Sequence, residues 1–305
     1  MKDKILFISF LVIVIIGWRL LLKSTSNLEP IINPKELIPI SAISHGHGLA
    51  VDLNDPNKVY IATHYGLILF DAGKLYQIGT KKDDYMGFSQ HPTDPNIFFA
   101  SGHPSTGGNI GFQKSTDGAF NWQQISLGVD GPVDFHAMTV SPANPDYVYG
   151  WYQGNVQRSI DGGANFEIVN KNILAVQLTA DSEDTKTIYA ANPAGQGILV
   201  SRDGGVTWSP LSADLSLGQV AGIASDPKNA KHMLAFSEKL GGLAQSIDHG
   251  ATWEKVPASF DGTLLFTSFF RKDPSVVYAL ANTNSLYKSV DGGMTWNQVG
   301  KGVAE

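Results

Sequence analysis

The sequence predicts an all-β protein, a six-bladed β-propeller of four-stranded antiparallel blades. An octapeptide recurs with a period near 44 residues, and each period holds four short runs rich in β-branched and aromatic residues. No helical periodicity follows residue 30. Four-stranded units of ~40–50 residues are typical of propeller blades. The alternative, a stacked β-solenoid, usually has shorter repeats and lacks such an aspartate turn.

The repeated octapeptide has aspartate at its third position and an aromatic residue at its eighth. Five copies read STDGAFNW, SIDGGANF, SRDGGVTW, SIDHGATW and SVDGGMTW, and LFDAGKLY is a degenerate sixth copy. Steps of 46, 44, 42, 45 and 43 residues separate the aspartates, which are Asp71, Asp117, Asp161, Asp203, Asp248 and Asp291. So regular a spacing indicates six copies of one structural unit.

The chemistry of the octapeptide favours a structural role. Its aspartate can accept hydrogen bonds from turn amides, and glycine at position five permits a positive φ. The closing aromatic residue begins the fourth strand and buries a large apolar surface. Five near-identical copies cannot each be an active site, so we interpret the six aspartates as structural.

The pattern S-x-D-G-G-x-T-W resembles the Asp-box (BNR) repeat of sialidases, sortilin-type receptors, xyloglucanase-like glycoside hydrolases and photosystem II assembly propellers. The resemblance covers residues 47–300 and implies Asp-box turns between the third and fourth strands of each blade. These families share blades and differ in chemistry, so the resemblance implies a fold and no single function. Exported bacterial Asp-box proteins described as glycosyl hydrolase-like have a similar overall plan.

Composition narrows the classes of partner. The chain has 305 residues, 43% hydrophobic and 16% charged, which fits one or two packed domains. Its net charge is −6 and its folded part has no basic run, so no nucleic-acid partner is expected. The absence of cysteine excludes disulfides, thiolate metal sites and cysteine nucleophiles.

Residues 1–26 predict export as a signal peptide or an N-terminal membrane anchor. Lys2 and Lys4 precede an apolar run over residues 5–16, and only Arg19 interrupts its continuation to residue 22. We therefore expect an extracytoplasmic protein, either secreted or held at the cytoplasmic membrane by this segment. Residues 27–43 form a linker whose end, ELIPISAI (36–43), is a candidate closing strand on blade six. Residues 44–301 form the propeller.

The predicted topology sorts the histidines between the two ends of the ring. The Asp box lies at the same end as the turn between the first and second strands. In propellers that this chain resembles, the opposite end carries the ligand site. His91, His232 and His249 fall at the Asp-box end. Five histidines from the first three blades fall at the opposite end, namely His45, His47, His64, His103 and His136.

An alignment of the blades on their turn prolines reveals an asymmetry at that opposite end. His47 then matches Met86 and His136, whereas His45 matches Asp84 and Asp134. The later blades have apolar or neutral residues there, namely Leu174, Val176, Gln219, Ala221, Thr263 and Leu265. The histidines and aspartates are ligand types for zinc or copper. The alternative is a set of hydrogen-bonded histidines that fill a polar channel.

Two enzymatic functions make different demands on the residues at the same end. A sialidase needs an arginine cluster for its substrate carboxylate, and none of the four arginines maps there. A glycoside hydrolase needs two carboxylates, for which Asp84 and Asp134 are the candidates. Aromatic residues that could bind a glycan or protein ligand are Tyr65, Tyr85, Trp151 and Tyr152.

The favoured function is a ligand-binding or assembly module that uses this His/Asp/aromatic face, with a transition metal as its candidate cofactor. The alternative is a glycoside hydrolase-like enzyme. A third reading is an interaction module without a small ligand.

Overall fold

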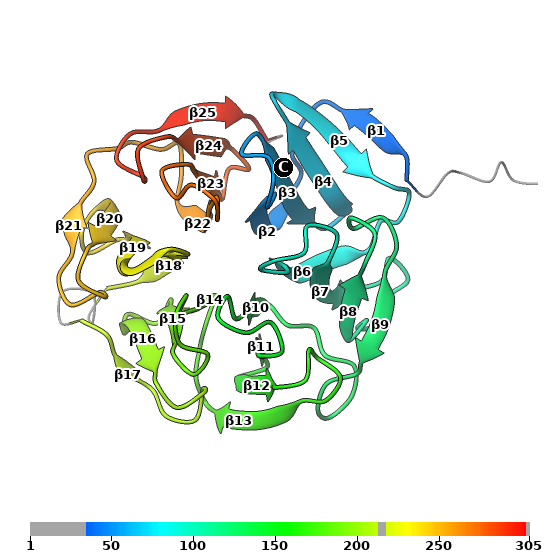
Figure 1. The fold of residues 1–305 in the computed structure, drawn as a ribbon, viewed down its shortest axis with the longest axis horizontal. Helices are drawn as coiled ribbons and strands as arrows, with labels where there is room; N and C mark the ends of the chain where they lie inside the picture. The colour runs from blue at the N-terminus through cyan, green and yellow to red at the C-terminus, as the bar shows by residue number, and fades with distance from the viewer. Residues whose placement is uncertain (1–34, 213–217, 303–305) are drawn as a thin grey trace, which may run out of the picture.

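The computed structural model describes residues 35–212 and 218–302, which form a ring of six β-sheets around a central axis (Figure 1). Every regular element in these ranges is a strand, so the predicted all-β propeller is confirmed. The predicted export segment and most of the linker lie outside the described residues. Within the described ranges, no helix has the length and apolarity needed to cross a membrane.

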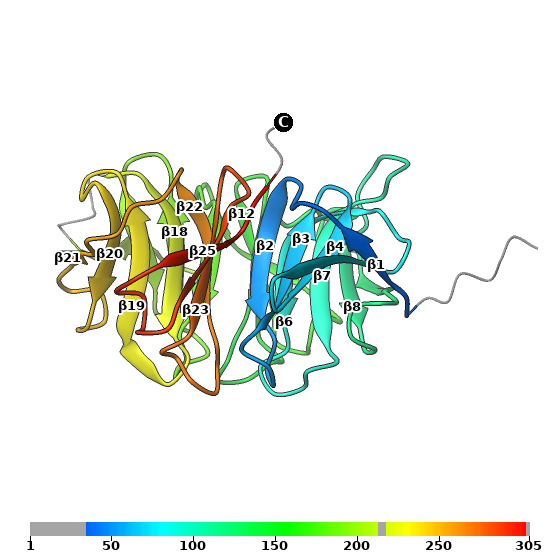
Figure 2. The same ribbon diagram turned by 90° about the horizontal axis from the view of Figure 1, so that it is seen from above.

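Each blade is a four-stranded antiparallel sheet whose strands follow chain order from the axis outward (Figures 1 and 2). Blade one contains β2 (Gly46–Val51), β3 (Lys58–Thr63), β4 (Gly66–Asp71) and β5 (Lys74–Ile78). Blade two contains β6 (Asp84–Gln90), β7 (Phe98–His103), β8 (Phe112–Ser115) and β9 (Gln123–Ser126). Blade three contains β10 (Ala137–Val140), β11 (Val148–Tyr152), β12 (Asn155–Ser159) and β13 (Glu167–Lys171).

The second half of the ring repeats this plan. Blade four contains β14 (Gln177–Ala180), β15 (Ile188–Asn192), β16 (Gly197–Ser201) and β17 (Ser209–Pro210). Blade five contains β18 (Val220–Asp226), β19 (Asn229–Ser237), β20 (Gly242–Ser246) and β21 (Glu254–Lys255). Blade six contains β22 (Leu264–Phe269), β23 (Val277–Ala281), β24 (Leu286–Ser289) and β25 (Asn297–Gly300).

The Asp box is a side-chain-stabilised turn between the third and fourth strands. In blade three, the Ser159 hydroxyl donates to Asp161 Oδ1 at 2.7 Å and accepts from the Gly163 amide at 2.9 Å. Asp161 Oδ1 also accepts from the amide of Asn165 at 2.9 Å. Gly163 has φ +90°, and an added Cβ would meet the Phe112 ring, so glycine is required there. The same serine–aspartate contact recurs in blades two, four, five and six.

One backbone hydrogen bond fixes the end of the ring at which the Asp boxes lie. In blade three, the amide of Gly162 donates to the carbonyl of Asp146, in the turn between the first and second strands, at 2.9 Å. Equivalent bonds occur in every blade, from Ala72, Gly118, Gly204, His249 and Gly292. The Asp boxes and these turns therefore share one end of the ring, which we call the Asp-box end. We call the other end the histidine end.

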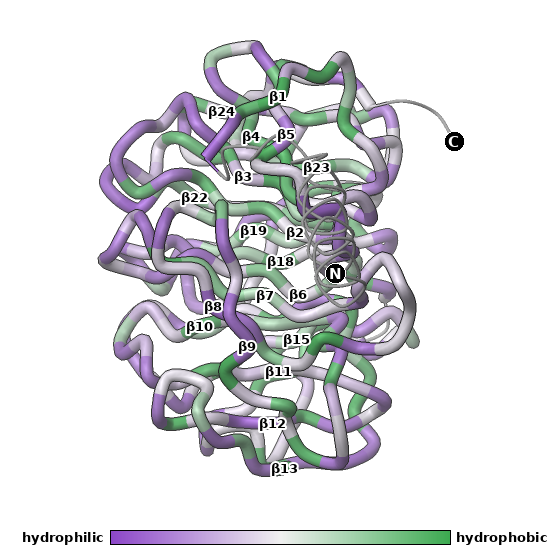
Figure 3. The backbone as a smooth tube through the Cα atoms, turned by 90° about the vertical axis from the view of Figure 1, so that its right-hand side faces the viewer, coloured by the Kyte–Doolittle hydropathy of each residue, from purple (hydrophilic) through white to green (hydrophobic). Residues whose placement is uncertain are grey.

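The apolar core consists of six clusters, one between each pair of neighbouring blades. Hydrophobic segments follow the strands, whereas many loops at the rim are hydrophilic (Figure 3). The blade six–blade one cluster includes Ile61 and Phe70 with Tyr278 and Leu280, all buried. Burial of each such side chain is worth about 1.5–3 kcal/mol relative to exposure. Both faces of every blade are thus covered by its neighbours.

Ring closure differs from the sequence expectation. Strand β1 (Leu37–Ile40) pairs antiparallel with β5, on the outer edge of blade one, so the expected pairing of residues 36–43 with blade six is wrong for this strand. Blade six already has its own fourth strand, β25, and β1 instead becomes a fifth strand outside β5 of blade one. Ile43 forms a parallel bridge to Gly302, after β25 of blade six.

Acid should unfold the protein partly through its Asp boxes. Hydrogen bonds from the Asn165 and Thr252 side chains, then from backbone amides, lower the pKa of Asp161 and Asp248 to about 2 from an ordinary 3.8. Because the folded pKa is depressed, the stabilisation is complete above pH ~3.8 and is lost as the pH falls toward ~2. We expect the midpoint of urea unfolding to fall across this window. At neutral pH, Asp161→Asn should unfold at a lower urea concentration than wild type, and its urea midpoint should fall less on acidification. If the urea midpoints of both proteins fell in parallel with pH, the assignment would be contradicted.

Candidate functional site

Three histidines of blade one converge at the histidine end, and we call them the blade-one cluster. His45 precedes β2, His47 lies within it, and His64 follows β3, whose antiparallel pairing brings the three together. The amide of His64 donates to the carbonyl of His45 at 3.3 Å. One nitrogen of each ring lies within 4.8 Å of the others.

A β-bulge directs His47 toward its neighbours. Gly46 pairs with Thr63 and Gly48 with Ala62, so His47 is the extra residue of β2. Equivalent register shifts occur in β6, β18 and β22, where the extra residues are Met86, Ala221 and Leu265. These are the positions that the proline alignment equated with His47.

Asp84 of blade two orients the blade-one cluster. Its Oδ2 lies 2.6 Å from His64 Nδ1, an inter-blade contact in which the imidazole donates to the carboxylate. That bond assigns the His64 proton to Nδ1 and leaves a lone pair on Nε2, which lies 3.1 Å from His47 Nε2. His47 Nε2 also lies 3.3 Å from His64 Nδ1, and the two rings meet edge to face at 72°. His47 therefore either donates its proton against the His64 ring or shares a cation with it after a rotation of the rings.

Burial, followed by the nearby His64, His45 and His136 rings, lowers the pKa of His47 from 6.5 to about 3. The His47 ring is therefore neutral at pH 7. Neutral imidazole is the form that can either accept a hydrogen bond or bind a metal ion.

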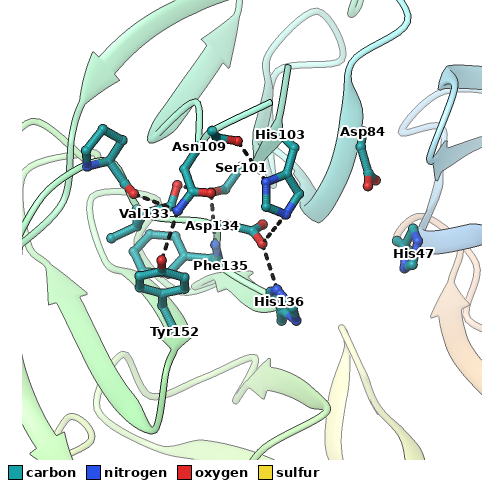
Figure 4. A network of polar contacts seen from close by, with 12 residues as sticks. His47, Asp84, Ser101, His103, Asn109, Val133, Asp134, Phe135, His136 and Tyr152 are labelled. Atoms are coloured by element: carbon teal, nitrogen blue, oxygen red, sulfur yellow. Dashed lines mark hydrogen bonds and ion pairs between the residues drawn. The ribbon is translucent and has the colours of Figure 1, made fainter. Parts of the chain in front are cut away.

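His103, Asp134 and His136 form a second group, the Asp134 cluster (Figure 4). Asp134 Oδ2 accepts from His103 Nε2 at 2.8 Å and from His136 Nε2 at 2.6 Å. The Asp134 side chain is 1% exposed, and its Oδ1 has no hydrogen-bond partner among the described residues. The hydrogen bond to Asp134 outweighs burial and raises the pKa of His136.

The backbone around Asp134 is held by blade two. The hydroxyl of Ser101, on β7, donates to the carbonyl of Val133 at 3.2 Å and accepts from the amide of Phe135 at 2.9 Å (Figure 4). His103 Nδ1 in turn lies 2.8 Å from the carbonyl of Gly108. Both nitrogens of His103 thus face oxygen acceptors, and only its imidazolium form donates to both at once.

The two clusters meet at the channel mouth. His47 and His136 both line a small cavity of about 50 Å³, together with Met86, Val176 and Phe266. This cavity is bounded by inner strands from both halves of the ring. The structure therefore brings the five predicted histidines and both predicted aspartates to one end.

The aromatic side chains that were predicted to bind a ligand differ in their exposure to solvent. Tyr65 is 59% exposed beside His64. Trp151 and Tyr152 are partly buried: the Trp151 indole donates to the carbonyl of Ile173 at 2.7 Å, and the Tyr152 hydroxyl accepts from the Asn109 side-chain amide at 2.9 Å.

Tyr85 corrects the sequence prediction, because its side chain is 1% exposed and packs against Trp122. It offers no ring face to a ligand in this conformation. The period-two alternation of β6 carries Tyr85 to the blade interface, while the bulged Met86 points to the channel.

The repeat itself is detected by comparison with protein families. Residues 199–210 match the family described as BNR/Asp-box repeat. A xyloglucanase from Hypocrea jecorina (strain QM6a) is 34% identical over 172 residues, which cover 48% of this chain and 20% of that protein. The chain therefore spans about a fifth of the length of this curated relative.

Solved structures share the propeller fold at low identity. The GH74 enzyme of Niastella koreensis has a TM-score of 0.58 at 17% identity, covering 86% of this chain and 48% of that chain. The GH74 xyloglucanase of Xanthomonas campestris has a TM-score of 0.59 at 17% identity, covering 86% and 46%. YCF48 from Cyanidioschyzon merolae has a TM-score of 0.54 at 18% identity, covering 88% and 90%. At these identities the likeness concerns the fold alone.

The Asp134 cluster makes a prediction for histidine titration. Asp134→Asn should lower the pKa of His136, because the hydrogen bond to the carboxylate is the main cause of its elevation. A raised folded pKa stabilises the protein below pH ~6.5 and ceases to do so as the pH rises through the folded value. The stability lost in Asp134→Asn should accordingly be larger on the acidic side of that window. NMR titration of the histidine rings measures the shift, with Asp226→Asn at the Asp-box end as the control; an unchanged His136 titration in Asp134→Asn would rule the assignment out.

Proposed function

We propose that this Asp-box β-propeller is a ligand-binding module in which His45, His47 and His64 hold a transition metal ion at the histidine end of the channel. The observation that carries the proposal is the convergence of three imidazole rings, in which Nε2 of His47 lies 3.1 Å from Nε2 and 3.3 Å from Nδ1 of His64. Each ring has a nitrogen within 4.8 Å of the others.

The nitrogen spacing fits a tetrahedral ion. Zinc binds imidazole nitrogen at ~2.0–2.1 Å, which places two ligand nitrogens of one tetrahedron about 3.4 Å apart. The observed 3.1 Å between His47 and His64 is close to this value, and His45 lies within reach. Three protein ligands would leave a fourth position for water or an incoming ligand group. That open position distinguishes a ligand-binding or catalytic site from a closed structural one.

Asp84 supplies a feature that metal-binding histidines commonly have. A ligating histidine usually donates its second ring N–H to a carboxylate or carbonyl, which fixes the tautomer and raises the basicity of the ligand nitrogen. His64 makes this bond to Asp84 Oδ2 at 2.6 Å, from the neighbouring blade. This bond leaves His64 Nε2 as the nitrogen that can bind a metal ion. Imidazole ligands suit both zinc and copper.

We propose in addition that the propeller lies outside the cytoplasm. The support for this location is the basic, then apolar, N-terminal segment over residues 1–26, which we propose acts as a signal peptide or tethers the chain to the cytoplasmic membrane. The ligand would be a glycan or a protein group that reaches the metal between the exposed Tyr65 and the half-exposed His136.

Metal analysis tests the proposal directly. Purified full-length protein without a polyhistidine tag should bind one zinc or copper ion per chain after exposure to excess metal. His47→Ala should reduce the affinity by more than the ~10–100-fold that is typical for loss of an outer-shell partner, and Asp84→Asn should reduce it within that range. His249→Asn, at the exposed Asp-box end, is the matched control and should bind normally.

His136→Ala separates the two clusters. Because His136 is bonded to Asp134, its loss should leave the metal stoichiometry unchanged. Equal loss of metal in His136→Ala and His47→Ala would move the ion to a site shared by both clusters. Wild-type protein that stays metal-free in excess zinc and copper would overturn the proposal and favour hydrogen-bonded histidines.

A second candidate function is glycoside hydrolysis, which the 34% identity to a xyloglucanase over 172 residues favours. Asp84 and Asp134 would be the carboxylate pair. Each is bonded to histidine in this structure, which leaves Asp84 Oδ1 and Asp134 Oδ1 as the unengaged oxygens.

Release of reducing ends from xyloglucan distinguishes the two functions. An enzyme should lose this activity in both Asp84→Asn and Asp134→Asn while Asp134→Asn still binds metal. A binding module should release no sugar in any variant. Activity that persists in both variants would exclude this carboxylate pair.

A further inference from the structure

The Asp-box end of the channel contains a second and larger cavity, of about 140 Å³. It lies where the inner strands end and lead into their turns, away from both histidine clusters. Hydroxyl side chains from blades two, three, four and six line it, namely Ser89, Thr139, Thr179 and Ser268. Engineered cavities of ~150 Å³ hold molecules the size of benzene, so this one can hold a small ligand.

Arg271 is the one charged residue among the described residues that line this cavity. Among the described ranges, no hydrogen bond or ion pair engages its guanidinium. Burial lowers the pKa of Arg271 to about 10, with no carboxylate acting to raise it. The group therefore stays positively charged at neutral pH, and its side chain is partly buried, with some of its surface still open to solvent.

The buried carboxylates in the turns at this end already accept other hydrogen bonds. Asp52, Asp181 and Asp226 lie in the turns at this end, and each accepts hydrogen bonds from the amides of its own turn. Asp52 and Asp181 also accept from tyrosine hydroxyls, and Asp226 contacts His232. None of the three lines the cavity, so none neutralises Arg271 there.

Several hydroxyl groups that line the same cavity as Arg271 are also available to donate hydrogen bonds. The Ser182 and Ser225 oxygens are buried and have no hydrogen-bond partner within the described part of the chain, and both residues line the cavity. Thr139 and Ser268 accept backbone amides, from Ala180 at 3.3 Å and Val51 at 3.4 Å, so their own O–H groups remain able to donate. The cavity is therefore lined by one cationic side chain and by several hydroxyl groups that can still donate a hydrogen bond.

We infer that this cavity is a binding site for a small oxyanion, a phosphate or carboxylate group, held by Arg271 and by the hydroxyls of Ser182 and Ser225. A guanidinium presents paired N–H donors that match two oxygens of such a group, and serine hydroxyls supply further donors after rotation about χ1. The inference is independent of the metal proposed at the histidine end. It assigns chemistry to the otherwise unpartnered Arg271.

Thermal unfolding of the full-length protein in Tris chloride, with EDTA, tests this site. Inorganic phosphate or acetate should raise the unfolding temperature above that in sodium chloride of equal ionic strength. Arg271→Gln should weaken the binding about 10–100-fold and abolish the rise. The exposed Arg202→Gln is the matched control and should respond as the wild type does. EDTA and a His47→Ala background exclude anions bound to a metal at the other end.

The unliganded variant provides a second readout. Without phosphate or acetate, Arg271→Gln should unfold at the same or a higher temperature than wild type, because a cation without a partner has been removed. If Arg271→Gln does not fold, the Ser182→Ala and Ser225→Ala variants take its place and should each weaken the anion response.

A larger rise with phosphate assigns the site to phosphate groups, and a larger rise with acetate assigns it to carboxylates. No rise with either anion in wild type, or an equal rise in Arg271→Gln, overturns the inference.

Discussion

Every other feature of this molecule depends on the packing of blade against blade. Each blade has apolar side chains on both faces, so no blade can bury its own surface, and six interfaces must form together. The last interface closes the ring through side chains: Tyr278 packs against blade one and its hydroxyl donates to the carbonyl of Pro56 at 2.9 Å. The Gly46 amide donates to Asn284 Oδ1 at 3.0 Å across the same junction. Closure is what brings the starts of the inner strands, and hence the histidines, around one channel mouth.

Packing does not account for the chemistry at that mouth. The bulged position of the inner strand carries His47 in blade one but Ala221 in blade five and Leu265 in blade six, with the same register shift in each. A blade therefore folds equally well with an apolar side chain there. What blades one to three add is a set of inter-blade polar contacts, among them His64 with Asp84 and His103 with Asp134. These contacts require neighbouring blades and could not form within a single repeat.

The repeat made the fold predictable, because its period, its turn residues and its β-rich runs all point to one architecture. It also assigned the histidines to the correct end, since strand order alone determines which loops share an end. Three features depended on side-chain placement that the pattern does not encode. Tyr85 packs into the blade interface next to the bulged Met86, Asp134 is buried between two imidazoles, and β1 adds to the outer edge of β5. Arg271 lies in the turn after β22, and only the closed ring shows that this turn faces the channel.

Two cavities adjoin each other along the channel, one toward each end. Five residues line both cavities, namely Leu49, Phe88, Met138, Gln177 and Leu178, and four of them are apolar. This girdle separates a histidine end, whose neutral and carboxylate-bonded imidazoles suit a cation, from an Asp-box end, whose guanidinium and hydroxyls suit an anion. A hydrated ion that crossed the girdle would lose water without gaining polar partners, apart from Gln177, whose Oε1 already accepts from the Ile223 amide. If both proposals hold, the two ends of one axis would bind chemically opposite ligands, a cation at the histidine end and an anion at the Asp-box end.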